Sequence, residues 1–220
     1  MDRQGSPHAA SAGNGAAAQV NLAARAKRSR MRPEERRADL VRAALQVAAS
    51  KGLGRLVHAD VARTASVSTP TAFFYFPDRE ALLKAVVREV DRYYRTMALN
   101  AHASTSPARR RIRDHVHKIV QSMDSDHDHA LIWLEWAALF RNEFGLWDMY
   151  VDLQNFVLGQ LVHTIKICQD EGTVPRKVAA STSARQILAG AQVMMQMKLM
   201  HQDQDVIESY LDSNIEHALA

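Results

Sequence analysis

The sequence predicts an all-α protein in which a small N-terminal helix-turn-helix unit precedes a larger helical domain. Three observations support this fold class. Apolar residues recur at three- and four-residue spacing through most of the chain, two short segments near residue 65 flank a brief turn, and no strand pattern competes with the helices. With 220 residues, of which 47% are hydrophobic, the chain is long enough to bury a substantial core.

The composition narrows the class of protein. The single cysteine, Cys168, cannot form an internal disulfide, and no run of about 18 apolar residues offers a membrane span. Residues 1–26 are rich in Ala, Gly and Ser and lack the apolar core of a secretory signal. We therefore expect a disordered tail there, a cytoplasmic location and no membrane partner.

Positive charge is concentrated just after this tail. The formal net charge is only +4, yet segment 25–42 holds eight Lys and Arg residues against three acidic ones. Such a run is typical either of a solvated segment or of an arm that contacts nucleic acid. The residues that follow it favour nucleic acid.

The first helix is predicted to begin at Pro33 and to end at Gly52. Proline suits the first helical position, Glu34 and Glu35 complement the positive end of the helix dipole, and glycine commonly ends a helix in the left-handed conformation. Its apolar side chains share one face and need packing partners nearby: Leu40, Val41, Ala44, Leu45, Val47 and Ala48.

Two short helices are predicted next, at 58–65 and 69–76. Ser68 is a favourable N-cap for the second helix, where Pro70 is tolerated because it falls within the first turn. Two short helices joined by a turn of a few residues make a helix-turn-helix.

The second of these helices has two different faces. Ala72, Phe73 and Phe76 are expected to seat it on the helix that begins at Pro33, because they follow helical spacing. Small hydroxyls and two aromatic rings occupy the other face, which predicts a surface able to enter a DNA major groove. That face comprises Ser68, Thr69, Thr71, Phe74 and Tyr75.

Segment 58–80 reads His-Ala-Asp-Val-Ala-Arg-Thr-Ala-Ser-Val-Ser-Thr-Pro-Thr-Ala-Phe-Phe-Tyr-Phe-Pro-Asp-Arg-Glu and resembles the DNA-binding signature of the TetR family. Within that family it is most similar to the LuxR/HapR-type quorum-sensing master regulators, which share the His-Ala-Asp opening, the Tyr-Phe-Pro-x-Arg-Glu ending and a basic arm. The resemblance is strong from about Lys27 to Val90. It implies a nucleoid-associated, homodimeric transcriptional regulator that binds a double-stranded DNA operator, as a repressor or a dual regulator linked to quorum sensing.

The resemblance also implies individual roles. The groove-facing residues of the second short helix would meet the bases, Tyr75 would bond a phosphate, and the arm would enter an adjacent minor groove. Phe74 departs from the subgroup, which typically has Asn there, and Pro70 replaces a residue that is usually small, so the operator sequence cannot be copied from the relatives. The full DNA-binding set is Arg28, Arg30, Arg32, His58, Ser68, Thr69, Thr71, Phe74 and Tyr75.

The chain is expected to divide into residues 27–80, which read DNA, and residues 81–220, which regulate and dimerise. Periodicity predicts a linker helix at 78–100. The last two helices have small residues at 189–191, and in this family such a pair forms a four-helix dimer interface. Further helices are expected at about 110–123, 129–142, 146–171, 183–202 and 206–219.

A small-molecule pocket is also implied. Segment 131–140 resembles the Trp-x-Glu-Trp pattern of the LuxR/HapR proteins, and aromatic and Met residues lie where that family places a cavity between helices. A pocket and a solid core use the same residue types, so both interpretations remain open. The candidate lining is Trp133, Trp136, Phe140, Gln154, Phe156, Gln192 and Met195.

Other classes of function have weaker support. The run at 124–129, Asp-Ser-Asp-His-Asp-His, has metal-ligating residue types but is contiguous, so a polar loop is favoured and no metal or cofactor is expected. The sequence shows neither a nucleophile with a paired base nor a Gly-rich phosphate loop, so it does not indicate an enzyme. The alternative is an all-helical protein with a metal- or ligand-binding role that does not read DNA, and a basic arm alone would also allow membrane or protein binding.

Overall fold

The computed structural model describes residues 32–139 and 145–220, and every regular element in these ranges is a helix. The predicted all-α fold is therefore confirmed. The predicted tail and the arm residues Arg28 and Arg30 lie outside the described residues. None of the helices in these ranges combines the length and apolar character needed to cross a membrane.

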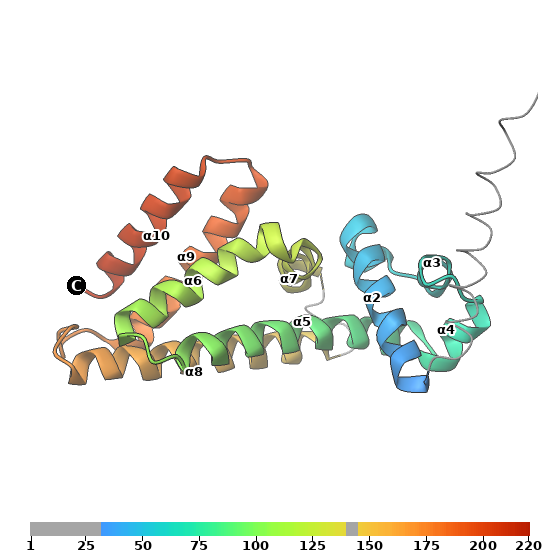
Figure 1. Ribbon diagram of the computed structural model, residues 1–220, viewed down its shortest axis with the longest axis horizontal. Helices are drawn as coiled ribbons and strands as arrows, with labels where there is room; N and C mark the ends of the chain where they lie inside the picture. Colours follow the sequence, from blue (N-terminus) through green and yellow to red (C-terminus); the bar gives the residue numbers. More distant parts are fainter. Residues whose placement is uncertain (1–31, 140–144) are drawn as a thin grey trace, which may run out of the picture.

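The N-terminal unit occupies one end of the molecule (Figure 1). A long helix, α5, leads from this unit into the larger part of the chain and ends in contact with α6 and α8. The order of elements up to that point is α2 (Pro33–Lys51), the 3-10 turn η1 (Leu53–Arg55), α3 (His58–Thr64), α4 (Thr69–Tyr75) and α5 (Arg79–His102).

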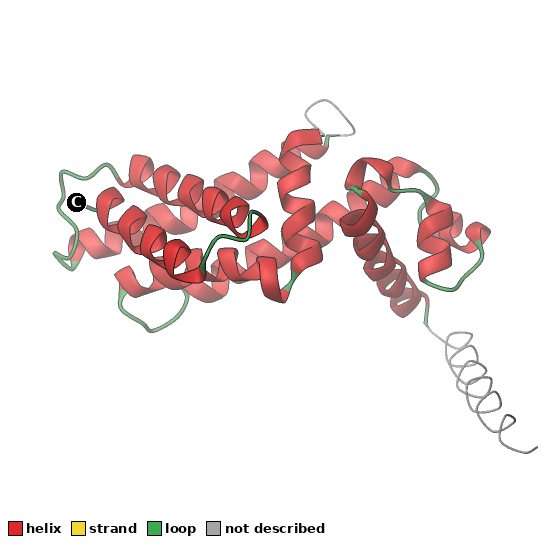
Figure 2. Cartoon of the chain, turned by 90° about the horizontal axis from the view of Figure 1, so that it is seen from above, coloured by secondary structure: helices red, strands yellow, loops and turns green. Residues whose placement is uncertain are grey.

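The larger part packs five further helices with α5. In Figures 1 and 2, α5 and α8 run side by side, whereas α9 and α10 lie at the end remote from α3 and α4. Helix α7 contacts both α2 and η1, so it joins the larger part to the N-terminal unit. These helices are α6 (Ala108–Ser125), α7 (His127–Leu139), α8 (Leu146–Asp170), α9 (Ala180–Leu199) and α10 (Gln204–Ala218).

The predicted ends of α2 agree with its local chemistry. Pro33 is its first residue, and the Glu35 carboxylate accepts a hydrogen bond from the Arg32 N–H at 3.2 Å. Gly52 follows the last turn with φ +93°, a region that side chains disfavour, and its N–H bonds the Ala48 carbonyl at 2.8 Å. All six apolar residues predicted to share a face are buried.

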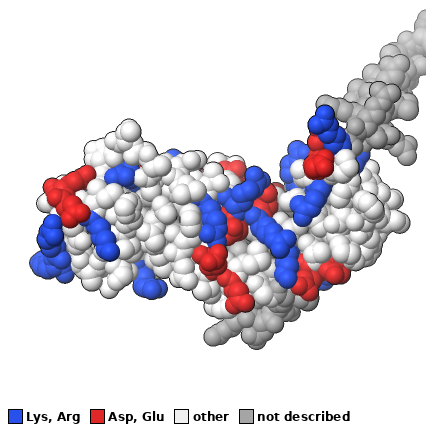
Figure 3. Space-filling view, turned by 90° about the horizontal axis from the view of Figure 1, so that it is seen from below, with Lys and Arg blue, Asp and Glu red and all other residues white. Residues whose placement is uncertain are grey.

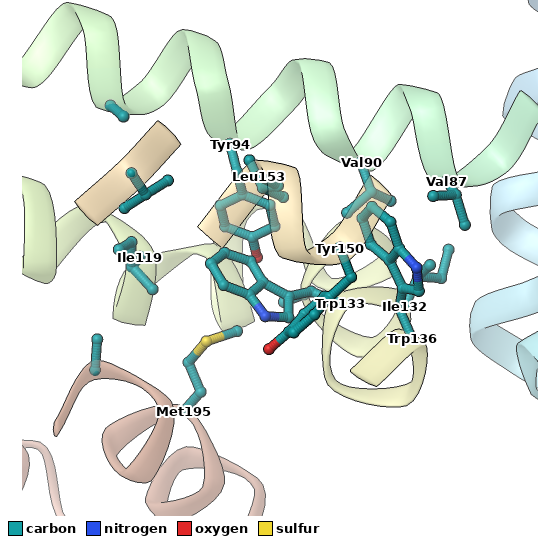
Figure 4. Close-up of a cluster of buried hydrophobic side chains, with 14 of the residues drawn as sticks. Val87, Val90, Tyr94, Ile119, Ile132, Trp133, Trp136, Tyr150, Leu153 and Met195 are labelled. Carbon is teal, nitrogen blue, oxygen red and sulfur yellow. The ribbon is translucent and has the colours of Figure 1, made fainter. Parts of the chain in front are cut away.

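Aromatic rings from three helices form the centre of the larger core (Figure 4). The Trp133 ring meets Tyr94 of α5 edge-on, with 3.9 Å between ring centroids, and Trp136 meets Tyr150 of α8 at 5.6 Å. Met195 of α9 is completely buried beside them. Large rings in such contacts contribute much of the burial that stabilises a helical core.

One buried polar network joins α5, α6 and α8. The His102 ring lies 2.8 Å from the Thr164 hydroxyl through Nδ1 and 2.8 Å from His115 Nδ1 through Nε2. Burial lowers the pKa of His102 to about 4 and that of His115 to about 3, because an imidazolium loses hydration there. Both rings are therefore neutral at neutral pH.

Helices α9 and α10 approach each other closely within one chain. A Cβ added to Gly190 would lie 2.6 Å from side-chain atoms of Asn214 in α10, so only glycine fits there without a shift. Ala191 is also buried, while Ala189 is exposed. The small residues expected to permit close approach thus serve, at least in part, the packing of α9 on α10 in the same chain.

Candidate nucleic-acid interface

Helix α4 is fixed to the N-terminal unit through one buried side. Ala72 and Phe76 are almost fully buried, as predicted. The imidazole Nε2 of His58, at the start of α3, donates a hydrogen bond to the Phe76 carbonyl oxygen at 2.7 Å. This bond connects the first residue of α3 with the end of α4 and holds the two helices at a fixed angle.

Two sequence predictions need correction at this point. Phe73 does not seat α4 on α2: its side chain is 45% exposed, and its ring stacks on His58 at 4.0 Å with 8° between the planes. His58 is itself buried, so it positions α4 from beneath and does not offer its ring to DNA. Helix α4 has only seven residues and packs mainly on α3, which shifts the buried sector away from the one that spacing alone predicts.

The remaining face of α4 is open. The Ser68 hydroxyl accepts the Thr71 N–H at 3.2 Å, which confirms Ser68 as the N-cap, and the two hydroxyl oxygens lie 2.7 Å apart. Thr69 is partly exposed, Phe74 is 81% exposed, and the half-buried Tyr75 ring meets Phe74 edge-on at 5.2 Å. The structure thus brings all five predicted groove-facing residues of α4 into one short segment.

Arg32 immediately precedes α2 and is exposed, and further arginines lie along the same helix. A groove of about 580 Å³ between α2 and α5 is lined by four guanidinium groups and two carboxylates. Figure 3 shows Lys and Arg side chains gathered with Asp and Glu where these helices meet. The charged lining consists of Glu34, Arg37, Arg42, Arg88, Glu89 and Arg92.

Sequence reasoning did not single out Glu135, which links the N-terminal unit to the larger part. One Glu135 carboxylate oxygen accepts the Leu53 N–H at 2.6 Å, across 82 positions of the chain. The feature of the sequence that points to Glu135 is the Trp-x-Glu-Trp pattern. Trp133 and Trp136 lie in the core, and the glutamate between them contacts η1. Within the N-terminal unit, the Arg79 guanidinium donates a hydrogen bond to the Gly54 carbonyl at 2.8 Å.

The predicted pocket residues come from α7, α8 and α9. Gln154 and Gln192 both donate to the Tyr150 hydroxyl, at 2.7 Å and 3.1 Å. Phe156 has a different partner: the Cζ atom of the Arg95 guanidinium lies over its ring, 4.7 Å from the ring centroid. Phe140 lies outside the described residues.

The two tryptophans of α7 differ in their hydrogen bonding. The Trp136 indole N–H donates to the Leu146 carbonyl at 2.8 Å. The Trp133 N–H is buried and has no hydrogen-bond partner among the described residues. A buried donor without a partner is costly, so Trp133 marks a place where an acceptor would be favourable.

The acidic and histidine-rich run between α6 and α7 is used in helix packing. Asp126 accepts the Tyr93 hydroxyl at 2.8 Å, His127 Nδ1 donates to the Met123 carbonyl at 2.9 Å, and Asp124 pairs with Lys198 at 2.5 Å. In the ranges that the structure covers, no three His, Cys, Asp or Glu side chains are grouped to hold a metal ion. The expected polar loop is wrong, because only Asp126 lies between the helices: the run ends α6 and begins α7, and it contacts α5 and α9.

The geometry described so far can be compared with known proteins. Residues 40–86 match the family model described as bacterial regulatory proteins of the tetR family. The N-terminal part of the chain is therefore similar to this family. The match spans α3, α4 and the first turns of α5, so it covers the exposed face of α4.

A curated relative extends the likeness beyond residues 40–86. The HTH-type transcriptional regulator LuxR of Vibrio harveyi is 34% identical over 128 residues, which are 58% of this chain. The match spans 62% of that protein, less than two thirds of its length. The relative is a transcriptional regulator, and the predicted resemblance to TetR proteins of the LuxR type is confirmed.

Solved structures of transcriptional regulators share most of the fold. A TetR transcription regulator from Haloarcula marismortui has a TM-score of 0.73 at 17% identity, covering 84% of this chain and 97% of that one. FadR from Bacillus subtilis, solved with stearoyl-CoA, has a TM-score of 0.68 at 16% identity, covering 83% and 97%. At such identities the likeness shows the fold alone.

Proposed function

We propose that this protein is a sequence-specific DNA-binding transcriptional regulator that reads an operator with α4. The observation that carries the proposal is the open face of α4, whose hydroxyls and aromatic rings project from a rigidly packed three-helix unit. A helix of this kind fits the major groove, and small hydroxyl side chains can bond base edges and phosphates. The match of residues 40–86 to the TetR family supports the same assignment.

Contacts to DNA divide between bases and backbone. Ser68, Thr69 and Thr71 face the groove, and the Tyr75 hydroxyl, which has no partner among the described residues, is free to bond a phosphate. The arm, with Arg28, Arg30 and Arg32, enters the neighbouring minor groove, where narrow A·T tracts attract arginine. His58 supports α4 from behind and does not belong to the contacting set.

The regulator acts as a homodimer, with residues 27–80 as the reading domain and residues 81–220 as the regulatory and dimerisation domain. The reading domains of the two copies must be about 34–36 Å apart, or a multiple of that, to reach successive major grooves of a pseudo-palindrome. Exposed apolar side chains on and between α9 and α10 support pairing with a second copy. These are Val193, Leu199, Met200, Val206 and Tyr210.

A small apolar effector controls this regulator through the core around α7. The unpartnered Trp133 N–H supports an acceptor-bearing ligand there, and FadR of Bacillus subtilis, which shares the fold, was solved with stearoyl-CoA. The resemblance to LuxR/HapR-type proteins extends the proposal to quorum-sensing control. The protein would act in the cytoplasm, in association with the nucleoid. Repression by blocking polymerase and activation are both compatible with this arrangement.

The deciding experiment is selection of bound sequences from a random duplex pool with the purified protein, followed by a salt titration of the winner. We expect a two-fold-symmetric site whose affinity falls steeply with salt, because several phosphates are neutralised. Tyr75→Phe should weaken binding to all sequences, and Thr71→Ala should change the preference among sites. An absence of any enriched sequence would contradict the proposal.

A further inference from the structure

We infer that Phe74 is a specificity-determining residue of α4 and that it recognises the C5-methyl group of a thymine in the operator. This inference rests on the proposed DNA-reading function and adds to it the chemical group that is read. The side chain is 81% exposed, the highest exposure among the large apolar side chains of the described residues. An aromatic ring left this open gains free energy when a partner covers it.

The position of the ring identifies the partner. Phe74 lies one turn after Thr71 in α4, so its ring projects from the face that carries the Ser68 and Thr71 hydroxyls. Those hydroxyls bond each other at 2.7 Å beside it. Phe73, the other exposed phenyl ring of α4, is held against His58, so the open apolar area is too small for a protein or lipid docking patch but suits a groove that presents isolated apolar groups.

The chemistry of the ring then selects the group that it contacts. A phenyl ring can neither donate nor accept a hydrogen bond, so it cannot read the polar edge of any base or hold a phosphate. The thymine methyl is the apolar group that the major groove presents, and phenylalanine is one of the side chains that contact it. Phe74 therefore favours T·A at the position it meets and disfavours base pairs that place a polar group there.

The neighbouring ring restricts where Phe74 can point. Tyr75 meets it edge-on, with 86° between the planes and 5.2 Å between centroids. Such contacts favour a particular ring orientation before DNA arrives, which lowers the entropy lost on binding. The exposed ring is thus directed outward from α4, toward the proposed groove.

The test is a methyl deletion in the DNA combined with a substitution in the protein. The operator is first selected with the wild-type protein, and each thymine is then replaced by uracil, which removes only the C5-methyl. Loss of one buried methyl should weaken the wild-type protein about fourfold for one half-site and roughly fifteenfold for both. Phe74→Ala should bind more weakly but should not distinguish uracil from thymine at that position.

Two further variants sharpen the result. Leu99→Ala, which removes an exposed apolar side chain of α5, should keep the wild-type response to uracil. Phe74→Asn should shift the preferred base at the same position toward adenine, which asparagine can bond at N6 and N7. Thermal unfolding of each variant should match the wild type, because neither side chain is buried.

The outcomes separate this inference from the proposed function. If an operator is found but no uracil substitution weakens binding, or if wild-type protein and Phe74→Ala respond equally, the recognition of a methyl group is refuted while DNA reading stands. If no operator is enriched at all, the proposed function fails and the inference fails with it. A Phe74-dependent loss at one thymine in each half-site supports both.

Discussion

The hydrogen bond between Glu135 and η1 leads to a prediction about stability and DNA binding together. The carboxylate accepts the N–H of the fully buried Leu53 at 2.6 Å, so its loss leaves a buried donor without a partner. Bonds to charged groups contribute about 1.5–3 kcal/mol, and Glu135→Ala should therefore lower the free energy of unfolding by about 2 kcal/mol. In a chain of this size that corresponds to a decrease in melting temperature of roughly 4–8 °C.

The assay is thermal unfolding followed by circular dichroism, together with operator binding at a fixed salt concentration. Glu135→Gln keeps an uncharged acceptor and should lose about half as much stability as the alanine variant. The exposed Glu171 provides the matched control, because Glu171→Ala removes a carboxylate without breaking such a bond. Operator affinity should fall for Glu135→Ala below its melting transition, since α7 then positions the reading unit less firmly. An unchanged melting temperature for this variant would refute the reasoning.

Three other outcomes are expected. Burial lowers the folded-state pKa values of His102 and His115, so the unfolded chain binds more protons than the folded chain below pH 6.5. The free energy of unfolding should therefore fall by about 2 kcal/mol per imidazole between pH 7 and pH 5. Equal urea midpoints at the two pH values would contradict this. Gly190→Ala should cost about 1–3 kcal/mol by overpacking, and Asn214→Ala in the same chain should recover most of it in melting experiments. Trp133→Phe should cost about 1–2 kcal/mol in urea unfolding through the cavity that it leaves, with no added cost from the N–H, which makes no bond in the described structure; a loss well above about 3 kcal/mol would contradict this.

Much of the fold could be predicted because local chemistry determines where helices begin and end. Pro33 and Ser68 occupy the positions that capping rules assign to them; Gly52 ends α2 with a positive φ, but its ψ of 139° differs from that of the expected left-handed cap. Phe73 shows where this reasoning fails. Spacing places it with Phe76, but which neighbour a seven-residue helix packs against is decided by tertiary contacts, here the stack on His58.

The candidate site was predictable in its residue types and less so in its contacts. The open face of α4 followed from the alternation of hydroxyls and aromatics. Glu135 could not be paired with Leu53, because no local rule connects residues 82 positions apart. Likewise, composition placed Trp133 and Trp136 in a core or pocket, but the difference between their indole hydrogen bonds depends on where Leu146 lies.

The buried histidine pair constrains how any signal can travel through this molecule. Each neutral imidazole has a single N–H, so the chain from Thr164 through His102 to His115 requires one consistent order of donors and acceptors. Apolar side chains tolerate a small slide of one helix along another, but directional bonds do not, and breaking them would strand buried polar atoms at about 1–3 kcal/mol each. Helices α5, α6 and α8 are thereby held in register at this network, so a conformational change that slides one of them along another must break these bonds.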